Sequence, residues 1–204
     1  MVVKVIDLRC SGCGSALATS EHSCKFCGNA VVVSSFNSVY AATAQDAVKW
    51  ARLLDKDLSE SENDETRGQI TATQAFCYLK LHRYDEALAK FRAAIEENFD
   101  NPEPYFYAAV CLLRGRKAFL ASLADIKLAI DYIASAQLIE NRGVFNYLLA
   151  YIKLDFHSRR CLRVSPDWRD ELATSHSAAP PVSPADAEML FTTLGVEPPV
   201  ELMF

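Results

Sequence analysis

The chain has 204 residues and a mass of 22.6 kDa, with 50% hydrophobic and 23% charged residues, which excludes collagen-like, disordered and low-complexity classes. Its 21 Lys and Arg against 26 Asp and Glu leave a formal charge of -5, which disfavours a general nucleic-acid binder. The N-terminal MVVKVIDLRC lacks the pattern of a secretory signal, and no apolar run reaches the length of a membrane-spanning helix. We therefore expect a cytoplasmic protein that does not enter a membrane.

Four of the seven cysteines form two CxxC pairs near the N-terminus. The segment CSGCGSALATSEHSCKFCG separates the pairs by ten residues, and Gly12, Gly14 and Gly28 stand where tight turns need unusual backbone angles. Two CxxC turns on neighbouring hairpins can supply four thiolates to one zinc ion. The flanking runs VVKVIDL and AVVVSSF are rich in β-branched residues and predict short strands.

This pattern resembles the zinc-ribbon family over residues 1–36. The resemblance implies one structural Zn²⁺ held by four thiolates with no open coordination position, the ligands being Cys10, Cys13, Cys24 and Cys27. Two unrelated redox or free cysteine pairs are the alternative, and His22 is expected at the surface. Because this segment has no basic excess once the thiolates are counted, a structural or protein-docking role is favoured over nucleic-acid binding.

Residues 43–172 predict a helical domain, with apolar residues at three- and four-residue spacings. Thr43 and Asp46 form a candidate capping box that predicts a helix start within TAQDAVKWARLLDKDL. The acidic SESENDE predicts a loop after this helix. The clearest helix begins at Tyr84 and carries one apolar stripe, formed by Tyr84, Ala87, Leu88, Phe91, Ala94 and Ile95.

This helix and the one before it resemble the tetratricopeptide repeat, a helix-turn-helix unit that stacks into an array. The match rests on Ala75, Tyr78 and YDEAL, followed by Phe91 and Ala94; it departs at Thr71, where Trp is common, and at Phe99, where Pro is usual. A looser copy starts at Pro104 and turns at Arg114–Arg116, and a third begins after Asn141–Gly143. The fold class expected is mostly α: a tetratricopeptide-like array of about six helices with a small N-terminal β zinc ribbon.

The resemblance implies that the first helix of each repeat lines a face that binds a peptide or helix of a protein partner. Aromatic side chains with an occasional Arg are common anchors of such faces, so the candidates are Tyr78, His82, Tyr105, Tyr107, Arg114, Tyr147 and Tyr151. The alternative is that these aromatics pack between helices. Cys77, Cys111 and Cys161 are expected to be core or half-buried residues.

Residues 173–204 predict a tail rich in Pro, Ser and Ala that carries one short amphipathic helix. Ser183 is its expected N-cap, Pro184 its first residue and Gly195 its end. This helix either folds back on the array or binds to a partner molecule. Self-association through the tail is therefore an open alternative.

Motifs for hydrolase, phosphate-binding, zinc-protease or dinucleotide chemistry are absent from the sequence. We therefore expect a noncatalytic zinc-binding adaptor that recognises a protein partner. Two alternatives stay open: a nucleic-acid-associated regulator that uses the ribbon and a basic helix end (His157, Arg159, Arg160, Arg163), and a noncatalytic subunit of an enzyme complex.

Overall fold

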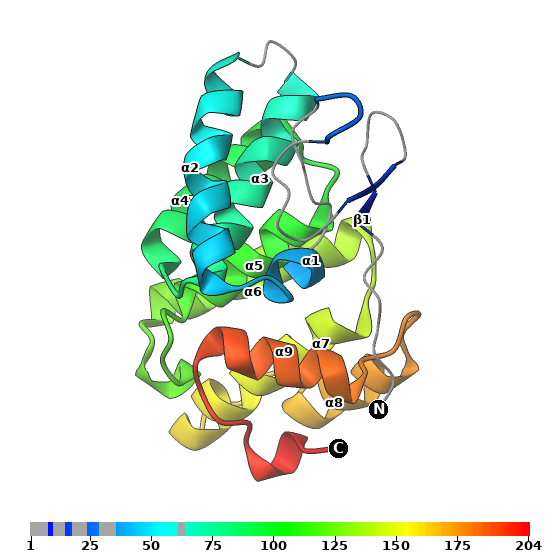
Figure 1. Ribbon diagram of the computed structural model, residues 1–204. Coiled ribbons are helices and arrows are strands. Elements are labelled where there is room, and N and C mark those ends of the chain that lie inside the picture. The colour runs from blue at the N-terminus through cyan, green and yellow to red at the C-terminus, as the bar shows by residue number, and fades with distance from the viewer. Residues whose placement is uncertain (1–7, 10–14, 18–23, 29–35, 61–63) are drawn as a thin grey trace. The chain divides into compact units, whose positions relative to one another are not determined.

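A computed structural model describes residues 8–9, 15–17, 24–28, 36–60 and 64–204 (Figure 1). The described chain is mostly helical, as the sequence predicted. It divides into two compact units, Met1–Asn98 and Phe99–Phe204, which we call unit 1 and unit 2. None of the described helices is long and apolar enough to cross a membrane.

Unit 1 contains a short hairpin and four helices among its described residues. The strands are β1 (Leu8–Arg9) and β2 (Ala16–Leu17), paired antiparallel with Leu8 opposite Leu17. The helices are α1 (Phe36–Tyr40), α2 (Ala44–Glu60), α3 (Asp64–Lys80) and α4 (Tyr84–Glu97). In Figure 1, α2, α3 and α4 lie side by side, and α3 packs on α1, α2 and α4.

Two sequence predictions in unit 1 are wrong. Phe36, expected in the strand AVVVSSF, begins α1 instead, because its ring is buried against Tyr40 and Phe76 at centroid distances of 5.8 and 5.9 Å. Part of the acidic segment SESENDE, expected as a loop, is helical as well. Since Glu is a strong helix former, α2 continues to Glu60, and α3 begins at Asp64.

The hairpin of α3 and α4 forms the core of unit 1. The predicted stripe of α4 faces inward: Ala87, Leu88, Phe91 and Ala94 are buried. Phe91 meets Phe76 of α3 edge-on at 5.4 Å. The predicted start of α2 is confirmed, because the Asp46 N–H donates to Thr43 Oγ1 at 3.1 Å.

Unit 2 continues with helices that pack mainly on their neighbours in the chain. They are α5 (Pro102–Leu112), α6 (Leu123–Ile139), α7 (Gly143–Ile152), α8 (Trp168–Ser177) and α9 (Pro184–Leu194). Helix α5 packs on α6, and α7 packs on α8. Helix α9 lies against both α5 and α7. The predicted break at Arg114–Arg116 is confirmed, with φ of 49° at Arg114 and 66° at Gly115. The predicted break at Asn141 is confirmed too, but Gly143, expected in the same break, begins α7.

Short helical segments complete unit 2. A 3₁₀ turn, η1 (Ala118–Leu120), precedes α6, and a π-helix, η2 (Lys153–His157), extends α7. Two further 3₁₀ turns follow, η3 (Ser158–Arg160) and η4 (Val200–Leu202). The sequence did not predict α8, which runs from residue 168 to 177 and therefore includes the ATSHS segment assigned to the tail.

The tail helix has the predicted boundaries. The Asp186 N–H donates to Ser183 Oγ, Pro184 is its first residue, and Gly195 ends it with φ of 66°. The helix is folded back within unit 2, where Leu190, Phe191 and Leu194 are buried. The C-terminal residues are held there as well, because the Tyr147 hydroxyl donates to the Leu202 carbonyl.

Candidate functional site: an apolar pocket beside the C-terminal helix

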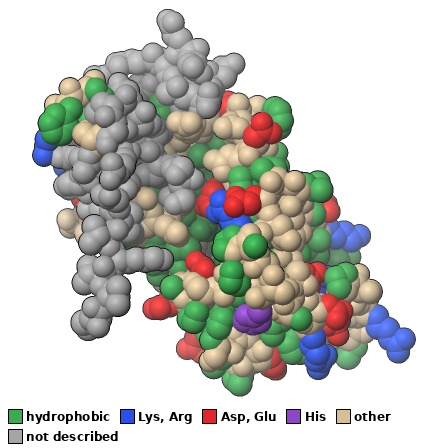
Figure 2. Space-filling model, turned by 90° about the vertical axis from the view of Figure 1, so that its right-hand side faces the viewer, with side chains coloured by type: hydrophobic (Ala, Val, Ile, Leu, Met, Phe, Trp, Pro, Cys, Tyr) green, Lys and Arg blue, Asp and Glu red, His purple; other side chains and the backbone are tan. Residues whose placement is uncertain are grey.

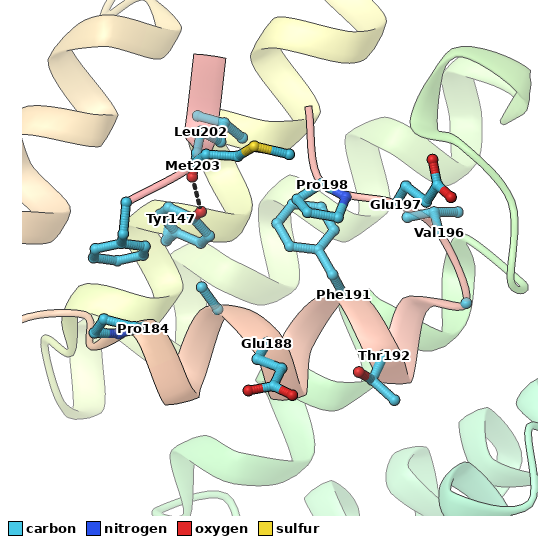
Figure 3. Close-up of a pocket in the computed structure, with 13 residues that line it drawn as sticks. Tyr147, Pro184, Glu188, Phe191, Thr192, Val196, Glu197, Pro198, Leu202 and Met203 are labelled. Carbon is cyan, nitrogen blue, oxygen red and sulfur yellow. Dashed lines mark hydrogen bonds between the residues drawn. The ribbon is translucent and has the colours of Figure 1, made fainter. Parts of the chain in front are cut away.

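A pocket of about 540 Å³ lies in unit 2 between α9, Tyr147 of α7 and the last residues of the chain (Figure 3). This volume falls in the range of about 300–1,000 Å³ that is typical of ligand pockets. The lining residues are Tyr147, Pro184, Ala187, Glu188, Phe191, Thr192, Gly195, Val196, Glu197, Pro198, Leu202, Met203 and Phe204. Most of them are apolar, so the pocket is suited to an apolar side chain.

Aromatic side chains form part of the pocket wall. Figure 3 shows Phe191 pointing from α9 toward Pro198. Its ring meets Tyr147 edge-on at 6.1 Å and Tyr151 edge-on at 5.2 Å. Burial raises the pKa of Tyr147 to about 12, so its hydroxyl stays protonated and keeps its hydrogen bond to Leu202 at neutral pH.

Two apolar residues that line the pocket are exposed to solvent. Met203 is 60% exposed and Phe204 is 58% exposed. The Phe204 ring lies 5.8 Å from Tyr147 and 5.3 Å from the imidazole of His176. Figure 2 shows one face of the molecule, on which a histidine lies next to hydrophobic side chains.

Two carboxylates stand at the edge of this apolar surface. Glu188 and Glu197 are exposed, and Figure 3 shows both carboxylates directed away from the hydrophobic side chains. Within the described residues neither makes an ion pair or a hydrogen bond. They belong to an acidic segment, since residues 170–204 contain no Lys or Arg and six acidic residues, Asp170, Glu171, Asp186, Glu188, Glu197 and Glu201. The pocket therefore attracts positive charge around an apolar centre.

The predicted partner-binding residues are divided between the two units and between core and surface. Tyr107, Tyr147 and Tyr151 are 4%, 1% and 1% exposed, which matches the alternative that these aromatics pack between helices. Tyr147 nevertheless forms part of the pocket wall. Tyr78 and Tyr105 are half-buried.

The two remaining predicted residues are at the surface. His82 is exposed at φ 55°, and its Nδ1 lies 2.8 Å from the Tyr84 hydroxyl. Arg114 is exposed and pairs with Asp125 at 3.7 Å. The structure thus does not gather the seven predicted residues into one surface within either unit.

The basic helix end is engaged in contacts within unit 2. Arg159 pairs with the buried Asp155 at 3.0 Å, and the Arg160 guanidinium lies 4.2 Å from the centroid of the Phe156 ring. Burial lowers the pKa of His157, which favours a neutral imidazole. Among these side chains Arg163 is exposed and has no ion pair within the described residues.

The three cysteines outside the CxxC pairs differ in their surroundings. Cys77 and Cys111 are fully buried, as predicted. Cys161 is exposed, which contradicts the prediction, because it adopts φ 55° directly after η3 and ends that turn at the surface. Burial raises the pKa of Cys77 to about 12, so this thiol is not ionised at neutral pH.

Half of the predicted zinc site lies within the described residues. Cys24 is buried and its Sγ lies 3.2 Å from Ser15 Oγ, while Cys27 is exposed. Cys10 and Cys13, like His22, lie outside the described residues. The described residues taken alone contain no group of three or more side chains that could hold a metal ion.

The described half of this site has the local geometry of a CxxC turn. Residues 25–27 form a turn that is closed by a hydrogen bond from the Gly28 N–H to the Cys24 carbonyl at 2.8 Å. Gly28 has φ of 76°, a conformation that favours glycine. In the sequence, Cys10 and Cys13 stand between β1 and β2, which pair with each other.

Comparisons of the chain with protein-family models, curated proteins and solved structures gave no match.

Proposed function

We propose that this protein is a noncatalytic adaptor whose unit 2 binds a segment of a protein partner in the pocket beside α9. The observation that carries the proposal is the combination of an apolar pocket of about 540 Å³ with two carboxylates, Glu188 and Glu197, that lack ion-pair partners among the described residues. The fitting segment carries a large apolar side chain flanked by Lys or Arg. The apolar side chain displaces water from the pocket. The flanking cations pair with Glu188 and Glu197 and so fix which residue of the segment enters the pocket.

The surrounding fold supports a recognition role. Helices that pack on their chain neighbours, as α3 does on α4 and α5 on α6, are what a tetratricopeptide-like array requires. The tight packing of Ala75 and Ala87, both fully buried, agrees with the small residues at those positions of the repeat. On this basis we propose that the helices within each unit pack as in such an array.

A peptide selection tests the binding proposal. Peptides selected from a random library on the full chain should carry Lys or Arg beside a large apolar residue. Their affinity should fall at least about tenfold for Glu188→Lys/Glu197→Lys, and also for Met203→Asp. Glu201→Lys is the matched control, because Glu201 is exposed in the same acidic segment but does not line the pocket. Peptides that bind the pocket variants and the wild type equally would overturn the proposal.

A single structural zinc ion is the second part of the proposed architecture. The residues present fit such a site, since Cys24 and Cys27 lie on one turn and the segment with Cys10 and Cys13 is bracketed by β1 and β2. The metal would supply a cross-link between the two CxxC pairs.

Metal analysis of the intact chain tests the zinc proposal. We expect one zinc per chain, loss of this zinc in Cys24→Ser, and retention in Cys161→Ser, which removes an exposed thiol elsewhere. Helical circular dichroism should remain in Cys24→Ser, because Cys24 belongs to none of the described helices. Equal zinc content in both variants would refute the assignment of Cys24.

A further inference from the structure

A second exposed apolar surface of unit 2 lies at the turn between α5 and α6. We call it the η1 turn and define it as residues 116–123. Leu120 is 61% exposed, Leu123 is 52% exposed and Phe119 is 39% exposed. Phe119 and Leu120 are neighbours in the chain and Leu123 follows three residues later, and such large apolar side chains open to water form a patch of the kind that marks binding surfaces.

Hydrogen bonds on its inner side hold the η1 turn firmly. The Ala118 N–H donates to the Tyr151 hydroxyl at 3.2 Å, and the Phe119 N–H donates to Asp155 Oδ2 at 2.9 Å. On the other side Arg160 donates to the Phe119 carbonyl at 2.6 Å and lies 5.0 Å from the centroid of its ring. Since the backbone is already ordered, binding through this turn costs little conformational entropy.

The charge of the η1 turn is opposite to that of the pocket. Arg116 and Lys117 come directly before the apolar residues and are exposed. Neither makes an ion pair with another residue in the described part of the chain. The turn therefore combines large apolar side chains with adjacent Lys and Arg, which is the chemistry that the pocket selects under the proposed function.

We infer that the η1 turn of one copy of this protein docks into the α9 pocket of a second copy. This inference rests on the proposed function, because it names the occupant of the same pocket. Leu120, the most exposed large apolar residue of the turn, enters among Phe191, Pro198 and Met203, while Arg116 and Lys117 meet Glu188 and Glu197. The turn and the pocket share no residue, so one copy presents both halves of the contact.

The contact is heterologous, since different surfaces of the two copies meet. Such a contact extends into open chains of copies unless its rotation closes a ring. One turn in one pocket buries less than a standard interface, which places it among weak, transient contacts. We expect a self-association constant in the micromolar range or weaker and a mean mass that rises with protein concentration.

Charge reversal in pairs gives the sharpest test, with sedimentation velocity of the full chain as the measurement. Arg116→Glu/Lys117→Glu puts an acidic turn against an acidic pocket, and Glu188→Lys/Glu197→Lys puts a basic turn against a basic pocket. Each variant alone should remain monomeric at concentrations where the wild type associates. An equimolar mixture of the two should associate again, because every turn then meets a pocket of opposite charge.

Two leucine variants distinguish this contact from nonspecific hydrophobic association. Leu120→Ser should weaken self-association at least about tenfold. Leu138→Ser is the matched control, because Leu138 is a 90% exposed leucine of the same unit and lies outside the turn. Thermal melting of all variants should match the wild type, since the substituted side chains are exposed.

The outcomes distinguish the two proposals. A wild-type chain that stays monomeric while selected peptides bind its pocket refutes the self-association and leaves the proposed function standing. Association that survives both charge reversals, or a mixture that does not restore it, also refutes the inference. If neither peptides nor a second copy engages the pocket, both proposals fail.

Discussion

Replacing Gly143 with Ala should destabilise unit 2 strongly, although alanine is the better helix former. Gly143 is the first residue of α7, and the chain segment that leads to α9 passes directly over it. A methyl group at this position would overlap the Ser175 carbonyl oxygen and the Val182 amide nitrogen. Since both are backbone atoms, no side-chain rotation relieves the overlap.

The size of the effect follows from the contacts that must shift. Moving the segment away weakens two hydrogen bonds, from the Gly143 N–H to the Pro180 carbonyl at 2.9 Å and from the Val182 N–H to the Ser175 carbonyl at 3.0 Å. Each contributes about 1 kcal/mol. Overpacking adds about 1–3 kcal/mol, and the higher helix propensity of alanine returns about 1 kcal/mol. The net loss of unfolding free energy is therefore about 2–4 kcal/mol.

Urea unfolding followed by tryptophan fluorescence measures this loss. The chain has two tryptophans, Trp50 in unit 1 and Trp168 in unit 2, so a Trp50→Phe background makes the signal specific for unit 2. Gly68→Ala of unit 1 is the matched control, followed through Trp50 in a Trp168→Phe background, because its methyl group would lie 3.3 Å from the Cβ atoms of Glu97 and Asn98, a tight contact with side-chain atoms. If Gly143→Ala loses no more unfolding free energy relative to its own background than Gly68→Ala does, the reasoning is refuted.

Two further predictions concern buried ionisable groups. Lys153 and Glu171 form an ion pair at 2.6 Å with side chains 7% and 9% exposed, so Lys153→Met should cost about 3–5 kcal/mol by urea unfolding. Lys153→Met/Glu171→Leu should recover most of that loss, and no recovery would contradict the pairing. Burial raises the pKa of the Cys77 thiol from 9.0 to about 12. As the pH rises, this thiol therefore loses its proton in the unfolded chain before it does so in the folded chain. The free energy of unfolding should thus fall between pH 9 and pH 12. Cys77→Val should flatten this fall, and equal slopes in both proteins would contradict it.

Local signals in the sequence predicted the helices that carry them. The stripe from Tyr84 and the caps at Ser183 and Gly195 depend on residues within one or two turns. Helix α4 begins at Tyr84 as expected, and α9 has both of its expected bounds. Helix α8 was missed because the Ser- and Ala-rich ATSHS suggested a tail. A signal was present, since the Asp167 side chain accepts from the Asp170 N–H in a capping box.

The pocket could not be predicted in the same way, because its parts are distant in the chain. It exists only where α9 and the C-terminal residues meet Tyr147, whose hydroxyl bonds to Leu202 across 55 residues. Sequence reasoning named Tyr147 as a partner residue on a repeat face. The structure places it in the core and in the pocket wall at once, since its ring packs on Phe191 and Phe204.

The C-terminal segment serves both as structure and as binding surface, and this determines how its function can be dissected. Phe191, Leu194 and Leu202 are buried in unit 2, so deleting residues 173–204 would expose the faces of α5 and α7 that they cover. Loss of binding after such a deletion would therefore report unfolding as readily as loss of the pocket. Glu188, Glu197 and Met203 are exposed, and substituting them alters the pocket while the buried side chains stay in place. Point variants at these three positions are thus the means to separate recognition from folding.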